Sequence, residues 1–187
     1  MTARLFLNTA ASRFHTDRKT GEEPRVVCLS WWRDDSPDPV CHLIRPATGM
    51  TMDPSTFPYH KLTIEQLELD GVDPQWVIRE WEDAARGVQS IFAFNADFHF
   101  RNLYRFMGHT GALMGRATVC AMKLAEPIVA IPAMRPGGGF KTPNMRECCE
   151  RFGIPVPASD DPIEFALSTV QAVRAIYEAC VQEINTP

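Results

Sequence analysis

The spacing of hydrophobic residues changes part-way along the chain, and this change limits the folds that the chain can adopt. Up to residue 45 the hydrophobic residues gather in three short runs typical of strands, Arg4–Leu7, Val26–Arg33 and Pro39–Arg45. The segments between these runs are charged and rich in Pro, Gly and Asp, which favour turns. We therefore expect the first part of the chain to form an antiparallel meander.

After these runs the hydrophobic residues recur at helical spacing. Thr63 and the pair Asp73-Pro74 are typical of helix N-termini, and the second of these helices should end near Gly87. This order of elements predicts an α/β fold, a mixed sheet covered by helices, in one domain over residues 1–187. The remaining expected elements are a strand over Ser90–Phe94, a helix over Asp97–Met107, a strand passing into a helix over Ala117–Ala125, and helices over Thr142–Phe152 and Pro162–Ile184.

The sequence indicates a soluble protein. No apolar run approaches the roughly 18–20 residues that a membrane helix needs, and the N-terminus lacks the long apolar region of a signal peptide. We expect a cytoplasmic location and no membrane partner. The cysteines form no CxxC pair, so we expect buried free thiols; a structural zinc site, which needs four ligands, has only Cys41-His42 as a local cluster. The six cysteines are Cys28, Cys41, Cys120, Cys148, Cys149 and Cys180.

Charge is unevenly distributed along the chain. The formal net charge is −4, which argues against coating nucleic acid by charge alone. Residues 99–151 nevertheless carry eight basic and three acidic side chains, whereas residues 52–98 carry three basic and nine acidic ones. The basic stretch is able to meet phosphate or an acidic partner, or it forms a solvated surface.

Five segments in chain order carry patterns of a known family. They read Phe6-Leu7-Asn8-Thr9-Ala10-Ala11, His60-Lys61-Leu62-Thr63-Ile64-Glu65 with Gly71 beyond, Phe94-Asn95-Ala96-Asp97-Phe98-His99 followed by Leu103, Cys149-Glu150-Arg151-Phe152-Gly153-Ile154, and Asp160-Asp161-Pro162-Ile163-Glu164-Phe165-Ala166-Leu167-Ser168-Thr169. Together they resemble the DnaQ-like (DEDD) 3′–5′ exonuclease superfamily over about residues 4–178. The resemblance implies a ribonuclease H-like fold with a mixed sheet of about five strands.

The resemblance also implies which positions would carry chemistry. In the family, four carboxylates hold two Mg²⁺ or Mn²⁺ ions, and a histidine is the general base. In this chain Asn8, Ala10, His99 and Phe165 take the carboxylate positions, and Asp160 takes that of the general base. A pair of metal ions needs several anions to offset its charge. The resemblance therefore implies a catalytically degenerate member, a pseudoenzyme for which no metal cofactor is expected.

One alternative keeps the activity through rearranged ligands. Asn8, Asp97, His99 and Asp160 are the candidates for a single metal site, since imidazole and carboxylate suit such an ion; Mg²⁺ or Mn²⁺ would then be the cofactor. Asp97, Asp160 and Asp161 also have a simpler interpretation as helix N-cap residues.

Three functions remain open from the sequence. The first is binding of single-stranded nucleic acid or a protein partner through the former substrate groove. The second is the active exonuclease with rearranged ligands, and the third is a structural or interaction protein without nucleic-acid contact. For the first, the basic residues nearest the motifs are the predicted phosphate contacts. They are Arg101, Arg105, Arg135, Lys141 and Arg146.

Overall fold

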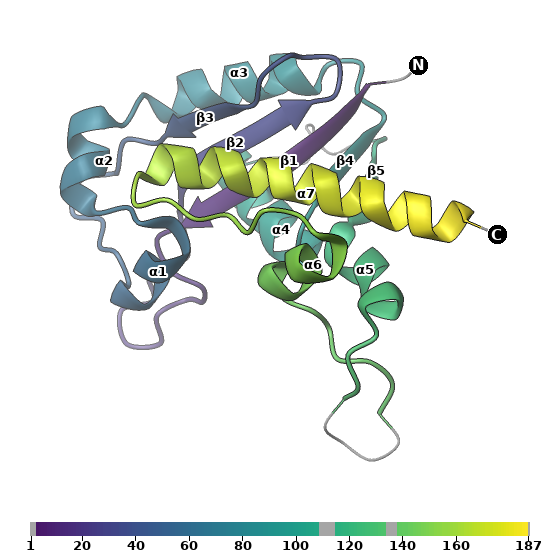
Figure 1. The fold of residues 1–187 in the computed structure, drawn as a ribbon. Helices are drawn as coiled ribbons and strands as arrows, with labels where there is room; N and C mark the ends of the chain where they lie inside the picture. Colours follow the sequence, from purple (N-terminus) through teal and green to yellow (C-terminus); the bar gives the residue numbers. More distant parts are fainter. Residues whose placement is uncertain (1–2, 109–114, 134–137, 187) are drawn as a thin grey trace.

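Strand β1 (Arg4–Ala11) is the middle strand of a five-stranded sheet, in a computed structural model that describes residues 3–108, 115–133 and 138–186 (Figure 1). It pairs antiparallel with β2 (Val26–Arg33) and parallel with β4 (Ser90–Ala93). β3 (Val40–Leu43) and β5 (Ala117–Cys120) are the edges, in the order β3-β2-β1-β4-β5. The predicted mixed sheet of about five strands, with an antiparallel meander at its start, is confirmed.

The helices confirm the helical pattern read from the sequence. Residues 54–60 are helical, which the sequence did not predict. They form only a 3₁₀ turn and a single α-helical turn, and they hold two prolines, which are not typical of helix interiors. No helix within the described ranges is long and apolar enough to cross a membrane. The helices are η1 (Pro54–Thr56), α1 (Phe57–His60), α2 (Ile64–Asp70), α3 (Pro74–Ala85), α4 (Ala96–Met107), α5 (Ala121–Val129), α6 (Met145–Phe152) and α7 (Pro162–Asn185).

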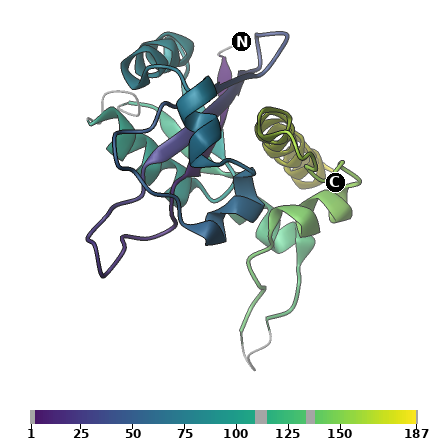
Figure 2. The same cartoon turned by 90° about the vertical axis from the view of Figure 1, so that its left-hand side faces the viewer.

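Helices cover both faces of the sheet. In Figure 2, α7 and α6 lie on one side of the strands, and α3 lies on the other. Side chains alternate between the faces along a strand, so Leu5 and Leu7 of β1 pack towards α3 and α4, in a cluster with Trp81 and Leu103. Phe6 points the other way and joins a cluster that includes residues of α5, α6 and α7. β1 is thus buried on both faces, as its continuous apolar run indicated.

The long helix α7 holds one face together. It contacts strands β1, β2, β3 and β4 as it crosses the sheet (Figure 1). Its start is fixed by Asp161, whose carboxylate accepts hydrogen bonds from the backbone N–H groups of Ile163 (2.8 Å) and Glu164 (2.9 Å). The N-cap role expected for Asp161 is therefore confirmed.

The N-cap role expected for Asp97 is wrong. α4 begins one residue earlier than expected, at Ala96, and Asn95 precedes it in the left-handed conformation (φ 57°) that asparagine adopts more readily than most residues. Asp97 lies in the first turn instead, where its carboxylate is 3.1 Å from Nζ of Lys123 in α5.

The cysteines are free thiols, as predicted. Four are buried and two, Cys41 and Cys120, are half-buried. Sγ of Cys28 lies 3.4 Å from Sγ of Cys41 on the neighbouring strand. Burial disfavours the thiolate, and the hydrogen bond with Cys41 followed by burial raises the pKa of Cys28.

Gly71 occupies a point where three backbone segments nearly touch. The N–H of Val72 donates to the carbonyl of Leu43, and the N–H of Arg45 donates to the carbonyl of Val72, which joins the end of β3 to the residues after α2. A Cβ atom on Gly71 would lie 2.2 Å from the carbonyl oxygen of Leu67 and 2.7 Å from Cα of Arg45. No side chain fits there without moving the backbone.

We predict that Gly71→Ala lowers the free energy of unfolding by about 1–3 kcal/mol, because overpacking forces backbone shifts of this cost. The matched control is Gly139→Ala, whose added Cβ meets no heavy atom within 4 Å; it should change stability by less than about 0.5 kcal/mol. Urea denaturation of the two variants measures the difference. Equal destabilisation of both would contradict this account of Gly71.

Candidate functional site

The candidate site lies at the end of β1. Asn8 and Ala10 share the face of β1 that α7 covers, since Ala10 packs against a cluster that includes Ala166 of α7. Nδ2 of Asn8 donates to Oγ of Ser30 (3.4 Å), and Oγ of Ser30 donates to the carbonyl of Ala166 (3.3 Å). Phe165, the residue before Ala166, is half-buried in the first turn of α7. The structure therefore brings Asn8, Ala10 and the start of α7 together.

His99 approaches the same strand end from α4 and is buried, but it lies on the face of β1 opposite to Asn8 and Ala10, beside the Thr9 side chain. Its Nδ1 accepts a hydrogen bond from the backbone N–H of Thr9 (3.0 Å) and lies 2.9 Å from the Thr9 hydroxyl. Because Nδ1 accepts from an N–H group, the ring proton is on Nε2. Burial lowers the pKa of His99 to about 4, and hydrogen bonding to the backbone of Phe94 opposes this only in part. His99 is neutral at pH 7.

The residues at this place do not fit a pair of divalent metal ions. Asn8 offers a neutral oxygen, Ala10 and Phe165 offer no ligand atom, and the Nδ1 lone pair of His99 is occupied by Thr9. Within the described ranges, no three His, Cys, Asp or Glu side chains gather into a group that would hold a metal ion.

The two carboxylates considered with them are placed differently. Asp97 is exposed and paired with Lys123, and Asp160 is exposed in the segment before α7. Among the residues that the structure describes, no hydrogen bond joins either carboxylate to Asn8 or His99, and neither belongs to a group that could hold a metal ion.

The five basic residues predicted to contact phosphate are not gathered in one place. Arg101 and Arg105 are exposed on α4, whereas Arg146 is exposed on α6, across the sheet. Lys141 precedes α6 and pairs with a carboxylate of that helix (Nζ–Oε1 2.5 Å). Arg135 lies outside the described residues.

An aromatic cluster, formed by Phe14, Tyr59 and Phe98, lies beside His99. The ring centroids of Phe14 and Tyr59 are 5.1 Å apart with perpendicular planes (89°), and those of Phe14 and Phe98 are 6.2 Å apart. The ring of Phe98 contacts that of His99, at 5.2 Å. Tyr59 is 67% exposed. Phe14 and Phe98 are half-buried, so Tyr59 is the ring of this cluster that suits the stacking of flat ligands.

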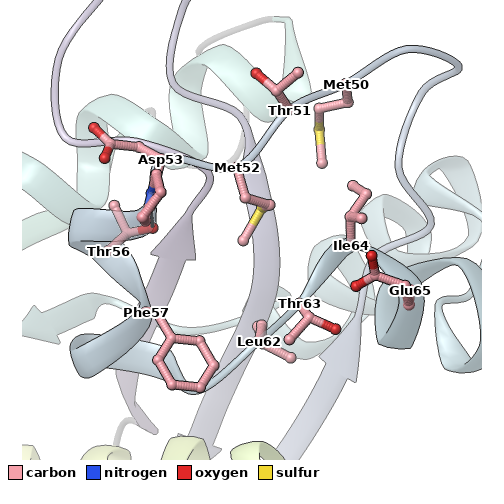
Figure 3. A pocket seen from close by; sticks show the side chains of 11 residues that line it. Met50, Thr51, Met52, Asp53, Thr56, Phe57, Leu62, Thr63, Ile64 and Glu65 are labelled. Atoms are coloured by element: carbon pink, nitrogen blue, oxygen red, sulfur yellow. Dashed lines mark hydrogen bonds between the residues drawn. The ribbon is translucent and has the colours of Figure 1, made fainter.

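A cavity lies on another side of α1. It has a volume of about 550 Å³ and lies between the segment 50–57 and the start of α2 (Figure 3). We call it the methionine cavity; its apolar lining is Met50, Met52, Phe57, Leu62 and Ile64.

The aromatic cluster and the methionine cavity lie on different sides of α1. Positions two apart on a helix point about 200° apart, so Phe57 lines the methionine cavity while Tyr59 faces Phe14. Neither feature was predicted from the sequence. The sequence feature that could have indicated them is the run Phe57-Pro58-Tyr59-His60, which places two aromatic residues in a polar surrounding.

Several solved structures of exonuclease I are similar to this chain. The zinc-bound form of the Escherichia coli exonuclease I–ssDNA complex aligns with 100% of this chain and 41% of its own, at a TM-score of 0.74 and 13% identity. E. coli exonuclease I in complex with a dA16 oligonucleotide aligns with 99% of this chain and 44% of its own (TM-score 0.65, 12% identity). Exonuclease I from Methylocaldum szegediense aligns with 99% of this chain and 41% of its own (TM-score 0.68, 16% identity).

The comparison establishes the fold. This chain spans less than half the length of these exonucleases. No protein-family model matches the sequence, and no curated protein does. The sheet order and these neighbours show an α/β ribonuclease H-like fold of the exonuclease type, as the five sequence segments implied.

Two buried histidines predict a pH dependence of stability. Burial lowers the pKa of both His60 and His99 to about 4, from an ordinary value of 6.5. As the pH falls from about 6.5 to 4, the unfolded chain binds protons that the folded chain does not. The free energy of unfolding should therefore fall over this range, by up to about 1.4 kcal/mol per pH unit for each histidine.

His99→Asn should reduce this slope, because an amide oxygen can still accept the hydrogen bond from Thr9 but does not titrate. His15→Asn, a change at an exposed histidine, should leave the slope as it is. Urea denaturation between pH 4.5 and pH 7.5, roughly the range in which histidines titrate, measures it. An unchanged slope in His99→Asn would show that this histidine is not buried in its neutral form.

Proposed function

We propose that this protein is a catalytically degenerate member of the DnaQ-like exonuclease superfamily that binds single-stranded nucleic acid without hydrolysing it. The observation that carries the proposal is the hydrogen bond between Nδ1 of His99 and the backbone of Thr9. This hydrogen bond holds the neutral ring of His99 at the strand end, where the family resemblance implies a metal-binding carboxylate.

The chemistry of the residues supports the absence of hydrolysis. Divalent ions about 4 Å apart repel strongly, and a two-metal mechanism depends on anionic ligands that offset this repulsion. The positions of Asn8, Ala10, His99 and Phe165 supply no negative charge. The transition state therefore lacks stabilisation of several kcal/mol, and each 1.4 kcal/mol corresponds to about tenfold in rate.

The aromatic cluster supports nucleic-acid binding. Neighbours of the same fold have been solved with single-stranded oligonucleotides. Phe14, Tyr59 and Phe98 lie beside the former catalytic position, and Tyr59 is the most exposed of the three. Stacking of a base on an aromatic ring contributes about 1–3 kcal/mol and tolerates any base. Aromatic stacking thus takes the place of the arginine contacts expected from the sequence.

Protein binding is the second candidate function. Asp160, Asp161 and Glu164 are exposed around the start of α7, close to the strand end that carries Asn8. Without bound metal ions these carboxylates repel phosphate and attract a basic surface.

We predict that the purified protein does not shorten single-stranded DNA or RNA from the 3′ end in Mg²⁺ or Mn²⁺. The measurement is gel analysis of a 5′-labelled oligonucleotide, with exonuclease I as the positive control. Turnover that disappears in Asp160→Ala or His99→Ala would show instead that the ligands are rearranged and the enzyme is active.

We predict that Tyr59→Ala weakens binding of single-stranded oligothymidylate roughly 5- to 150-fold, the equivalent of one lost stacking contact. The matched control is Tyr104→Ala, since Tyr104 is also exposed but does not belong to the aromatic cluster. Fluorescence anisotropy at several salt concentrations gives the affinities, which should fall as salt rises. No binding at low salt, or equal loss in both variants, would favour the protein-binding function.

A further inference from the structure

The lining of the methionine cavity suits an apolar side chain. Met52 and Leu62 face the cavity from its middle, Met50 lies at its rim on the side of Ile64, and Phe57 lies on the opposite side (Figure 3). Methionine side chains are unbranched and polarizable, so they adapt to inserted groups of different shape. A volume of about 550 Å³ admits a large aliphatic or aromatic side chain together with part of a backbone.

The polar side chains around the cavity already have partners. The hydroxyl of Thr51 donates to Glu22 (2.8 Å), and that of Thr63 accepts from the N–H of Gln66 (3.3 Å). The carboxylate of Asp53 accepts from the N–H of Ser55 (2.9 Å). Little hydrogen-bonding capacity is left for reading the edge of a base, so burial of apolar surface has to supply the affinity.

The charge around the cavity is negative. Asp53 and Glu65 are the charged residues that line it, and Figure 3 shows them on opposite sides of the opening. No basic residue lines it, although Nη2 of Arg13 donates to the hydroxyl of Thr51 (2.8 Å) and Nζ of Lys61 lies 5.9 Å from the ring centroid of Phe57. The wider segment 50–70 carries four carboxylates and one lysine. A phosphate backbone is repelled by such a surface, whereas lysine and arginine side chains are attracted.

We propose that the methionine cavity binds a basic peptide segment of a partner protein. An aliphatic or aromatic side chain of the peptide inserts between Met50 and Met52, and flanking lysine or arginine residues pair with Asp53 and Glu65. This proposal is independent of nucleic-acid binding, because the aromatic cluster lies on the other side of α1.

The test uses the full chain labelled with ¹³C at methionine methyl groups. The probe is the peptide acetyl-Lys-Arg-Leu-Phe-Lys-Arg-amide, and the comparison peptide carries Glu in place of each basic residue. Signals of Met50 and Met52, assigned with Met50→Leu and Met52→Leu, should shift and saturate with the basic peptide alone. Glu65→Lys should weaken this binding about tenfold. Glu68→Lys is the control, since Glu68 lies on the same helix but does not line the cavity; it should change affinity less than about twofold.

Three results would overturn the proposal. The first is the absence of any shift of the Met50 and Met52 signals at millimolar peptide. The second is equal binding of the acidic peptide. The third is a shift of these two signals by a short oligothymidylate but not by the basic peptide. That result would show that the cavity binds nucleic acid instead. Loss of oligothymidylate binding in Tyr59→Ala has no bearing on these readouts, so the two proposals fail separately.

Discussion

Because β1 is hydrogen-bonded along both edges and covered by helices on both faces, the polar atoms at its end have to find partners inside the protein. Asn8 meets this requirement through Ser30 and the start of α7, and the backbone N–H of Thr9 meets it through His99. These two contacts join α4, α7 and the neighbouring strand to one short stretch of chain. The ring of His99 is therefore a neutral acceptor that satisfies the backbone N–H of Thr9.

Because these polar atoms are hydrogen-bonded inside the protein, the stability of the fold is separate from any catalytic chemistry. A ribonuclease H-like sheet needs its central strand packed and bonded, and these needs are met here by apolar and neutral residues. The same end of the sheet leaves the ring of Tyr59 exposed, and α1 divides the aromatic cluster from the methionine cavity. The residues that hold the fold together thus differ from those on which the proposed functions depend, so the fold shared with exonucleases does not fix the activity.

The regular elements could be predicted from sequence because their signals are local. The apolar run of β2, the Asp73-Pro74 start of α3 and the Asp161 cap of α7 appear at the predicted places. The candidate site was less accessible to prediction. The grouping of Phe14 with Tyr59 depends on how a loop and a single helical turn fold back on β1, and no period in the sequence encodes that. Likewise, charge counted along the chain grouped Arg101 with Arg146, although the sheet separates α4 from α6.

The position of α7 in the chain has a consequence for synthesis. All five strands are complete by residue 120, but the helix that contacts four of them ends only at residue 185. At about 5–20 residues per second, a ribosome takes roughly 3–13 seconds to make the residues in between. During that interval the apolar face that carries Phe6 and Phe92 lacks its long covering helix. The nascent chain thus passes through a stage at which it is prone to aggregate, and the emergence of α7 ends it.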